Sequence, residues 1–171
     1  MTKAMNAFKK PILAMIEGYC VGGGVATAIA CDMRFATKDT KYGIPAAKLG
    51  LAYGFDNLRQ LVELVGPSNA KRILFTGDMI DADDAHRIGL VDELCALDEL
   101  EDKVLSIADK ISANAPLTVL ASKETVKHVL RPEIRDHQKL KEMAKICFDS
   151  DDYREGREAF MEKRKPEFKG R

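Results

Sequence analysis

The chain lacks tryptophan, and only 6% of its residues are aromatic. It also lacks an excess of charge of either sign, because 27 lysines and arginines balance 27 aspartates and glutamates. A chain without a basic surplus is poorly suited to bind nucleic acid or an anionic membrane through charge alone. We therefore expect neither nucleic acid nor a membrane as its main partner.

Long apolar runs are also missing. The longest apolar stretch, Pro11–Ala30, contains Glu17 and a run of glycines, so it is not expected to form a transmembrane helix. Residues 1–6 lack the apolar segment of a secretory signal. These absences favour a cytoplasmic protein, and 171 residues are enough for one domain with a sizeable core and a helical appendage.

Cysteine and histidine are scarce and show no metal-binding spacing. The three histidines share no motif, and no C-x-x-C pair occurs among the four cysteines, which are Cys20, Cys31, Cys95 and Cys147. This pattern predicts free, mostly buried thiols in a reducing compartment, and it predicts neither disulfides nor a metal site.

The most informative feature that is present is the glycine triplet Gly22–Gly24. It separates the apolar segment 12–16 from the segment 26–31, which predicts a strand, a glycine turn and a helix. The first turn of a helix has unpaired N–H groups and a partial positive charge, so it can bind a phosphate, a carboxylate or a developing oxyanion. The spacing lacks the dinucleotide and P-loop signatures. Oxyanion stabilisation is therefore the sharper hypothesis, and a tight turn without a ligand is the alternative.

Hydrophobic periodicity predicts mixed strands and helices in the first half of the chain. The predicted strands or extended pieces cover residues 11–17, 32–37, 42–45 and 90–91. The predicted helices cover residues 23–31, 58–65, 68–75 and 82–88, and residues 46–56 are predicted to form a loop. Gly66-Pro67 is expected to end one helix, and Asp81 with Asp84 is typical of a capping box at the start of another.

The second half of the chain predicts helices alone. Their expected ranges are about 100–111, 116–131, 133–148 and 150–165. The change in pattern near residue 95 is the one boundary that the sequence suggests. The apolar faces of these helices need a partner, and we expect them to pack on the α/β half and on a neighbouring subunit.

Residues 10–24, KPILAMIEGYCVGGG, resemble the central block of the crotonase, or enoyl-CoA hydratase/isomerase, superfamily. Other fitting motifs follow in the same order, and they are Cys31-Asp32, Leu74–Gly77, Ala82–Ala85, Gly89–Val91 and Phe160–Arg164. The resemblance covers about residues 9–171. It implies an α/β fold with the spiral ββα core of the ClpP/crotonase type, whose second half is residues 1–95. It also implies a C-terminal helical region at residues 96–171, for trimerisation and CoA contact.

The resemblance further implies an acyl-CoA thioester substrate, a thioester enolate, a role in fatty acid metabolism and a homotrimer or hexamer. CoA enters as part of the substrate, so no separate cofactor is expected. Gly23 matches the glycine whose backbone N–H binds the thioester oxygen, and Gly22 adjoins it as a substrate-binding residue. Gly54 matches a second glycine that lines the site.

Phe160 and Lys163 match residues that contact the adenosine end of CoA, often across a subunit boundary. A flexible lysine is a suitable point cation for the phosphates of CoA. The alternative for Phe160 is packing on a helix face, and the alternative for Lys163 is a solvated charge in a basic tail.

Members of the superfamily begin with a further βα segment, and this sequence contains no match to it. That segment supplies a second oxyanion N–H group from an Ala-Gly-x-Asp type of loop. The fold is therefore expected to be N-terminally incomplete, and the chain is expected to be a fragment, a truncated product or the C-terminal part of a split protein.

Two alanines replace the usual carboxylates. Hydratases of the superfamily carry glutamates at the positions of Ala26 and Ala46. Hydration needs a base to activate water and an acid to protonate Cα, and alanine supplies neither. The usual hydration mechanism is therefore in doubt.

Tyr53 lies in a loop, residues 49–58, that resembles the loop of methylmalonyl-CoA decarboxylases, although those proteins keep a glutamate at the position of Ala26. Decarboxylation generates the enolate by loss of CO₂ and needs no base. Tyr53 is expected to bond the substrate carboxylate or to help protonate the enolate. The alternative is a half-buried loop tyrosine whose hydroxyl meets backbone or water.

Asp56 is the remaining nearby carboxylate. It is a candidate acid/base, but we favour it as the N-cap of a helix that begins near Asn57. The sequence hypothesis is thus an acyl-CoA lyase with Gly23, Tyr53 and Asp56 as candidate catalytic residues and decarboxylase-like chemistry. The alternatives are a non-catalytic acyl-CoA-binding or assembly subunit, and a hydratase or isomerase that uses Asp56.

Overall fold

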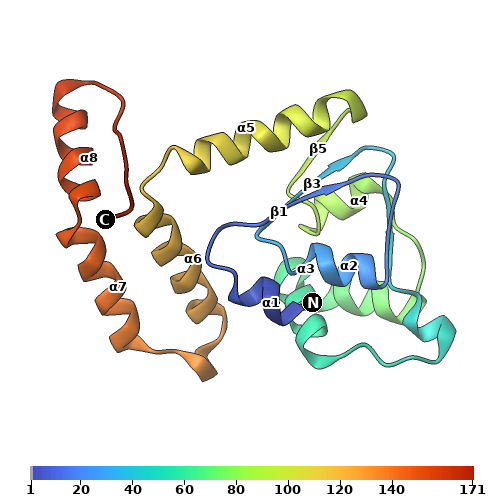
Figure 1. Cartoon of the computed structure of the whole chain (residues 1–171). Helices are drawn as coiled ribbons and strands as arrows, with labels where there is room; N and C mark the ends of the chain where they lie inside the picture. Colours follow the sequence, from blue (N-terminus) through green and yellow to red (C-terminus); the bar gives the residue numbers. More distant parts are fainter. Residues whose placement is uncertain (1) are drawn as a thin grey trace. The chain divides into compact units, whose positions relative to one another are not determined.

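A computed structural model describes residues 2–171 of the chain, with side chains from Ala4 onward (Figure 1). The chain forms two compact units. The first comprises Ile12–Leu105 together with the residues before Lys9, and the second comprises Lys9–Pro11 and Ser106–Arg171. The division falls within helix α5 (Leu100–Ser112). All strands of the described residues belong to the first unit.

The first unit contains two small parallel sheets. A three-stranded sheet has the order β1 (Leu13–Ile16), β3 (Met33–Thr37) and β5 (Glu93–Cys95). A two-stranded sheet pairs β2 (Tyr19–Val21) with β4 (Lys41–Gly43). Parallel neighbours need crossover connections, and helix α2 (Gly23–Ala28) lies in the connection from β2 toward β3. Strand β2 was not among the predicted elements.

The predicted strand at Leu90–Val91 is wrong, because the chain joins the sheet two residues later, at β5. Both backbone N–H groups donate to Ala85 O, at 2.8 and 3.2 Å, and thereby close the end of helix α4 (Ala82–Arg87). They cannot also join a strand ladder. The link to the sheet begins where Asp92 N donates to Arg34 O at 2.9 Å.

The helices of the first unit follow their local signals closely. Helix α4 has Asp81 as its N-cap, whose Oδ1 accepts from Asp84 N at 2.8 Å, so this half of the predicted capping box is confirmed. Helix α3 (Phe55–Thr76) is interrupted as predicted, because Gly66 has the non-helical angles φ 73° and ψ 163°. The predicted loop at 46–56 is corrected: a short 3-10 helix, η1 (Pro45–Leu49), occupies its first part.

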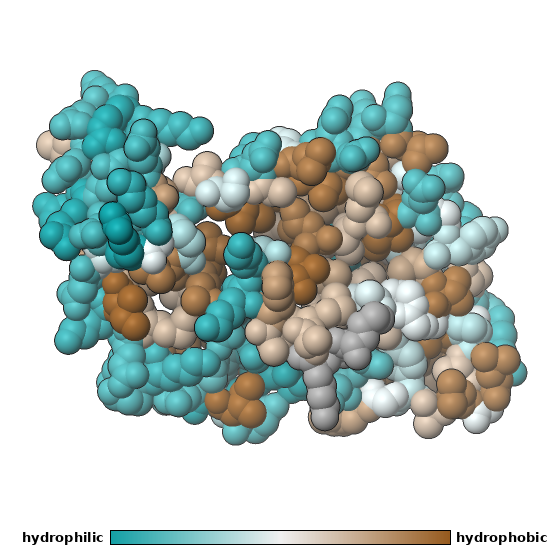
Figure 2. Space-filling model, viewed as in Figure 1, coloured by the Kyte–Doolittle hydropathy of each residue, from teal (hydrophilic) through white to brown (hydrophobic). Residues whose placement is uncertain are grey.

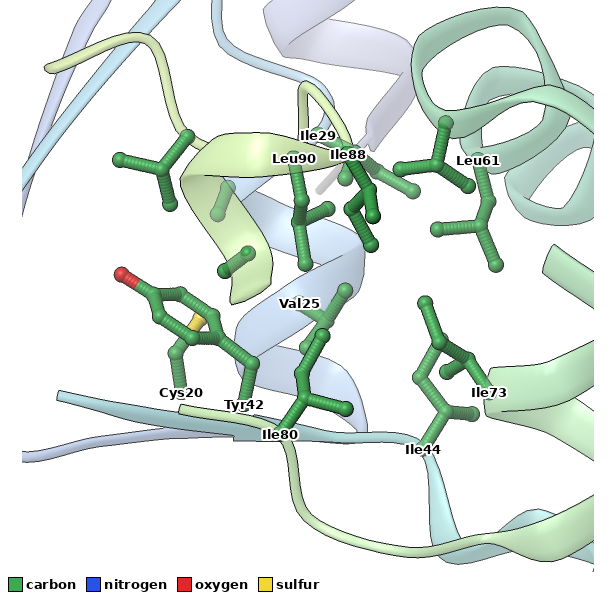
Figure 3. Close-up of a cluster of buried hydrophobic side chains, with 14 of the residues drawn as sticks. Cys20, Val25, Ile29, Tyr42, Ile44, Leu61, Ile73, Ile80, Ile88 and Leu90 are labelled. Carbon is green, nitrogen blue, oxygen red and sulfur yellow. The ribbon is translucent and has the colours of Figure 1, made fainter. Parts of the chain in front are cut away.

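The core of the first unit is apolar and lies between β2, β4, α2, α3 and α4 (Figure 3). Val25, Ile44, Leu61 and Val91 are buried almost completely. Burial of one such side chain contributes roughly 1.5–3 kcal/mol to stability. The glycine turn before α2 is therefore attached directly to the best-packed part of the chain.

The second unit is built from helices α6 (Pro116–Leu130), α7 (His137–Asp149) and α8 (Asp151–Glu162). Pro116 opens α6 as predicted. Helix α7 begins later than expected, because Pro132–Ile134 form the 3-10 turn η3 and Asp136 Oδ1 caps α7 through Lys139 N at 2.9 Å. Helix α8 ends earlier than expected, at Glu162, because Lys163 is left-handed.

No helix formed by residues 2–171 is both long enough and apolar enough to cross a membrane.

Candidate functional site

The glycine triplet forms the predicted strand, turn and helix, with β2 as the strand. Gly22 has φ 54° and ψ −106°, a backbone conformation that residues other than glycine rarely adopt. Its N–H donates to Gly43 O at 2.8 Å, and its carbonyl accepts from Ala26 N at 3.1 Å. The N–H groups of Gly23 and Gly24 lie in the first turn of α2, where no carbonyl of the same helix reaches them.

The turn is open on its outer side. Gly23 and Gly24 are exposed, no side chain caps the helix, and a Cβ added to Gly22 or Gly23 would meet nothing within 4 Å. Helix α2, with the sequence GGVATA, carries no charged residue. The arrangement therefore presents uncompensated N–H donors to an incoming oxygen atom.

Cys20 lies beneath the turn. A Cβ added to Gly24 would lie 3.7 Å from Cys20 Sγ, and Cys20 pairs with Tyr42 in the β2–β4 register. Figure 3 shows the Cys20 thiol beside the Tyr42 ring. Burial raises the pKa of the Cys20 thiol to about 11, so the thiol stays protonated at neutral pH and is not a thiolate nucleophile.

Two phenols adjoin this thiol. The hydroxyl oxygens of Tyr42 and Tyr53 are buried and have no hydrogen-bond partner among the described residues. Burial, and then the Cys20 thiol, raise the pKa of both phenols. The Thr40 hydroxyl acts in the opposite direction and lowers the pKa of Tyr42. It also shares a hydrogen bond with the Thr37 hydroxyl at 2.8 Å and donates to Ile16 O at 3.5 Å.

The Tyr53 hydroxyl has no backbone or side-chain partner among the described residues, and its catalytic role stays a prediction. A neutral phenol with a free donor hydrogen is suited to bond a substrate oxygen. Sequence reasoning found Tyr53 but missed Cys20, which acts on the pKa of Tyr53, and Tyr42, which pairs with Cys20. The three strand-favouring residues of β2, directly before the glycines, could have indicated a strand that places Cys20 beside another strand.

The two alanines that replace the usual glutamates differ in burial. Ala26 is half-buried in α2, and Ala46 is buried in η1. A carboxylate at either position would need a partner, because burial of an unpaired charge is costly.

Gly54 and Asp56 mark the start of α3. Gly54 is exposed and extended, and it is itself the N-cap of the helix. The predicted N-cap role of Asp56 is therefore wrong, because the helix starts at Phe55 and Asp56 lies inside its first turn. The Asp56 carboxylate is 81% exposed and lies 3.7 Å from Arg59, so it favours the helix N-terminus only through its charge.

Phe160 and Lys163 belong to the second unit. The Phe160 ring is 82% exposed, which does not fit the alternative of packing on a helix face of this chain. Lys163 is exposed and has φ 56°, and it is the one non-glycine residue with positive φ among residues 2–171. The substrate roles of both residues stay predictions.

Metal ligands do not gather anywhere among the described residues in a group of three or more histidine, cysteine, aspartate or glutamate side chains. The expectation that the protein needs no cofactor stays a prediction.

Comparison with known proteins gives consistent matches over the whole chain. A family model described as enoyl-CoA hydratase/isomerase matches residues 1–171. The crotonyl-CoA hydratase of Syntrophomonas wolfei is 38% identical over 167 residues, which cover 97% of this chain and 64% of that protein. The methylmalonyl-CoA decarboxylase of Escherichia coli is 31% identical over 175 residues, which cover 99% of this chain and 66% of that protein. The chain thus spans just under two thirds of the length of these relatives.

Solved structures agree with these relatives. An enoyl-CoA hydratase/carnithine racemase from Magnetospirillum magneticum matches with a TM-score of 0.93 and 34% identity, over 99% of this chain and 63% of that one. An enoyl-CoA hydratase from Mycobacterium tuberculosis matches with a TM-score of 0.87 and 34% identity, over 95% and 65%. The expected α/β crotonase-type fold with a helical C-terminal region is confirmed. The glycine turn, the motif order and these matches together show that the chain belongs to the enoyl-CoA hydratase/isomerase family of the crotonase superfamily.

Proposed function

We propose that the protein binds acyl-CoA thioesters and stabilises a thioester enolate. The observation that carries this proposal is the exposed, uncapped glycine turn, in which the Gly23 N–H is available to a thioester oxygen. Gly22 and Gly54 would line the bound thioester, and Phe160 and Lys163 would contact the nucleotide end of CoA. Removal of one oxyanion donor typically costs roughly 3–4 kcal/mol of transition-state stabilisation.

Decarboxylase-like chemistry suits the site better than hydration. In such a step the bond between Cα and the carboxylate carbon breaks, CO₂ leaves, and the electron pair forms the enolate, which then takes a proton at Cα. No base is needed, which agrees with Ala26 and Ala46. The neutral Tyr53 phenol, whose pKa is raised chiefly by burial, would bond the carboxylate or the enolate. The relative named methylmalonyl-CoA decarboxylase supports this class of reaction.

Hydration or isomerisation is the second candidate, because relatives named as hydratases are among the matches. In this case Asp56 would act as the acid/base. Its exposed carboxylate is solvated, which makes it a weak candidate for proton transfer in a dry site. A non-catalytic acyl-CoA-binding or assembly subunit is the third candidate, and the two alanines favour it. A homotrimer or hexamer remains part of each proposal.

The test compares CO₂ release from methylmalonyl-CoA with hydration of crotonyl-CoA, using the wild-type chain and two variants at Gly23. Gly23→Pro removes the N–H at the first helical position, where proline is tolerated, and should lower turnover about 10²–10³-fold. Gly23→Ala keeps the N–H and reports the steric effect of a Cβ. Circular dichroism checks that both variants fold.

Rapid hydration without CO₂ release would overturn the decarboxylase preference, and Asp56→Asn would then be expected to abolish turnover. Calorimetric binding of acetyl-CoA with no turnover of either substrate would support the binding subunit.

A further inference from the structure

Lys163 adopts a backbone conformation that its residue type disfavours. Every other residue with positive φ among residues 2–171 is a glycine. A left-handed residue with a side chain costs free energy, and such strain persists only where the surrounding structure enforces it. Lys163 therefore raises two questions: what enforces its conformation, and why the position is not a glycine.

A Schellman motif at the end of α8 places Lys163 at the position that usually favours glycine. Lys163 N donates to Phe160 O at 3.3 Å, and Arg164 N donates to Ala159 O at 3.0 Å. These two bonds reverse the chain directly after Glu162, and Figure 1 shows the C-terminal segment running back beside α8. The lysine is thus fixed at the apex of the reversal.

One face of α8 is adapted to the returning segment. Asp152 is buried, and its two carboxylate oxygens accept from Lys169 N at 2.6 Å and from Gly170 N at 2.8 Å. Gly156 lacks a side chain where Phe168 packs, since a Cβ added there would lie 3.4 Å from the Phe168 ring. The segment after Lys163 is therefore anchored along its length.

Arg164 joins the reversal to α8 by an ionic fork. Its Nη1 and Nη2 donate to the two carboxylate oxygens of Glu155 at 2.5 and 2.9 Å, and its Nε donates to Glu162 at 2.6 Å. Glu155 also accepts from Glu167 N at 2.8 Å. This bidentate geometry is specific to arginine, and it fixes the residue that follows Lys163.

The same fork keeps nearby carboxylates from pairing with the Lys163 ammonium. Glu162 precedes Lys163 directly, and its carboxylate is occupied by Arg164. Glu155, the other partner of Arg164, is occupied as well, and the fork lowers its pKa to about 2. No carboxylate pairs with the Lys163 ammonium among the residues that the structure describes.

We infer that Arg164 and Glu155 are positioning residues, which hold Lys163 left-handed and keep its ammonium unpaired for an anionic group of the ligand. Because this inference rests on the proposed function, the anionic group is a phosphate of CoA. The charge of Lys163 is used there, and the bonds of Arg164 to α8 compensate for the strain.

The experiment measures binding of coenzyme A and of pantetheine, which lacks the phosphates, to the full chain by calorimetry. Lys163→Gly relieves the strain and removes the charge, so affinity for coenzyme A should fall about tenfold, the loss of one charge-assisted contact. Affinity for pantetheine and thermal stability should not fall. Lys145→Gln, which removes one exposed charge from α7, is the matched control and should change neither affinity.

Arg164→Gln should also lower the affinity for coenzyme A but not the affinity for pantetheine. Adding Glu162→Gln should restore part of the lost affinity, because the Glu162 carboxylate can then no longer pair with Lys163. Glu155→Gln is the second variant if Arg164→Gln does not fold. A Lys163→Gly variant with an unchanged ratio of the two affinities overturns the inference. Equal loss for both ligands in the Arg164 variant also overturns it. Wild-type protein that binds neither ligand would instead overturn the proposed function.

Discussion

The two units of the chain are stabilised by different kinds of burial. In the first unit the buried residues are mainly apolar, and the core is continuous across α2, α3 and α4. In the second unit four residues are buried, and three of them are polar: His128, Ser150 and Asp152, beside Ala159. The buried side chains of the first unit therefore contribute mainly through the hydrophobic effect, whereas Ser150 and Asp152 in the second unit contribute through hydrogen bonds.

The surfaces of the two units are alike in one respect. Both leave large apolar side chains exposed, for example Leu49, Phe55 and Phe75 in the first unit and Phe148, Phe160 and Met161 in the second. On the face shown in Figure 2, the C-terminal helices are mostly hydrophilic with separate hydrophobic patches. A unit with little apolar core and much exposed apolar surface needs a partner for full stability. This agrees with the predicted role of residues 96–171 in trimerisation, which stays a prediction.

The largest expected difference between the units is in the cost of truncating a leucine. Leu61 is fully buried in α3, so Leu61→Ala should destabilise the chain by about 3 kcal/mol through lost burial and a residual cavity. Leu130 is 48% exposed, and Leu130→Ala should cost about 0.5 kcal/mol or less. Urea unfolding followed by circular dichroism measures both values. Equal costs would contradict the contrast between the units.

The second unit should be sensitive to a buried carboxylate instead. Asp152→Asn replaces one acceptor oxygen by a donor that faces a backbone N–H, and it should cost about 2 kcal/mol. Asp149→Asn, at the exposed end of α7, is the control and should be nearly neutral. Hydrogen exchange of the Lys169 and Gly170 amides should accelerate in the first variant only. Unchanged exchange would show that the anchor is dispensable.

Acid should loosen the second unit through Glu155. Hydrogen bonds from Arg164 and from Glu167 N lower the pKa of Glu155 from 4.5 to about 2. Because the pKa is depressed in the folded state, the stabilisation is complete above pH 4.5 and is lost as the pH falls toward 2. The amide signal of Glu167 should report this transition in NMR spectra. Glu155→Gln should abolish the transition, and its persistence in that variant would assign it to another group.

The smallest effect concerns the thiols, which should differ in reactivity without a change in stability. Burial raises the pKa of Cys20 and of Cys95, both in the first unit, so few thiolates form at these two positions. Cys147 in the second unit is only partly buried. Alkylation with iodoacetamide followed by peptide mapping should modify Cys147 well before Cys20, and all thiols should react at similar rates in urea. Early modification of Cys20 in native protein would contradict the burial of this cluster.

Local signals in the sequence predicted much of the fold correctly. Gly66-Pro67 interrupts α3, Asp81 caps α4, Pro116 opens α6, and α8 starts next to Ser150, as predicted. In each case the decisive interaction spans a few residues, so the residue type alone fixes it.

The errors occurred where a neighbour in sequence or in space decided the outcome. Strand β2 has only three residues, which is too short for periodicity to reveal. Gly54 rather than Asp56 is the N-cap of α3, because the extended backbone of Gly54 starts the helix earlier. Helix α8 stopped at Lys163 because the returning segment and Arg164 enforce the reversal.

The sequence by itself determined the family, the glycine turn and the absence of the usual carboxylates at Ala26 and Ala46, because these depend on residue identity at fixed spacing. Only the tertiary structure decided that the Cys20 thiol lies beside the Tyr42 ring, and that Arg164 binds back to Glu155. These contacts join residues far apart along the chain or on separate elements. Their formation depends on how strands pair and how helices pack, which residue types and spacing do not specify.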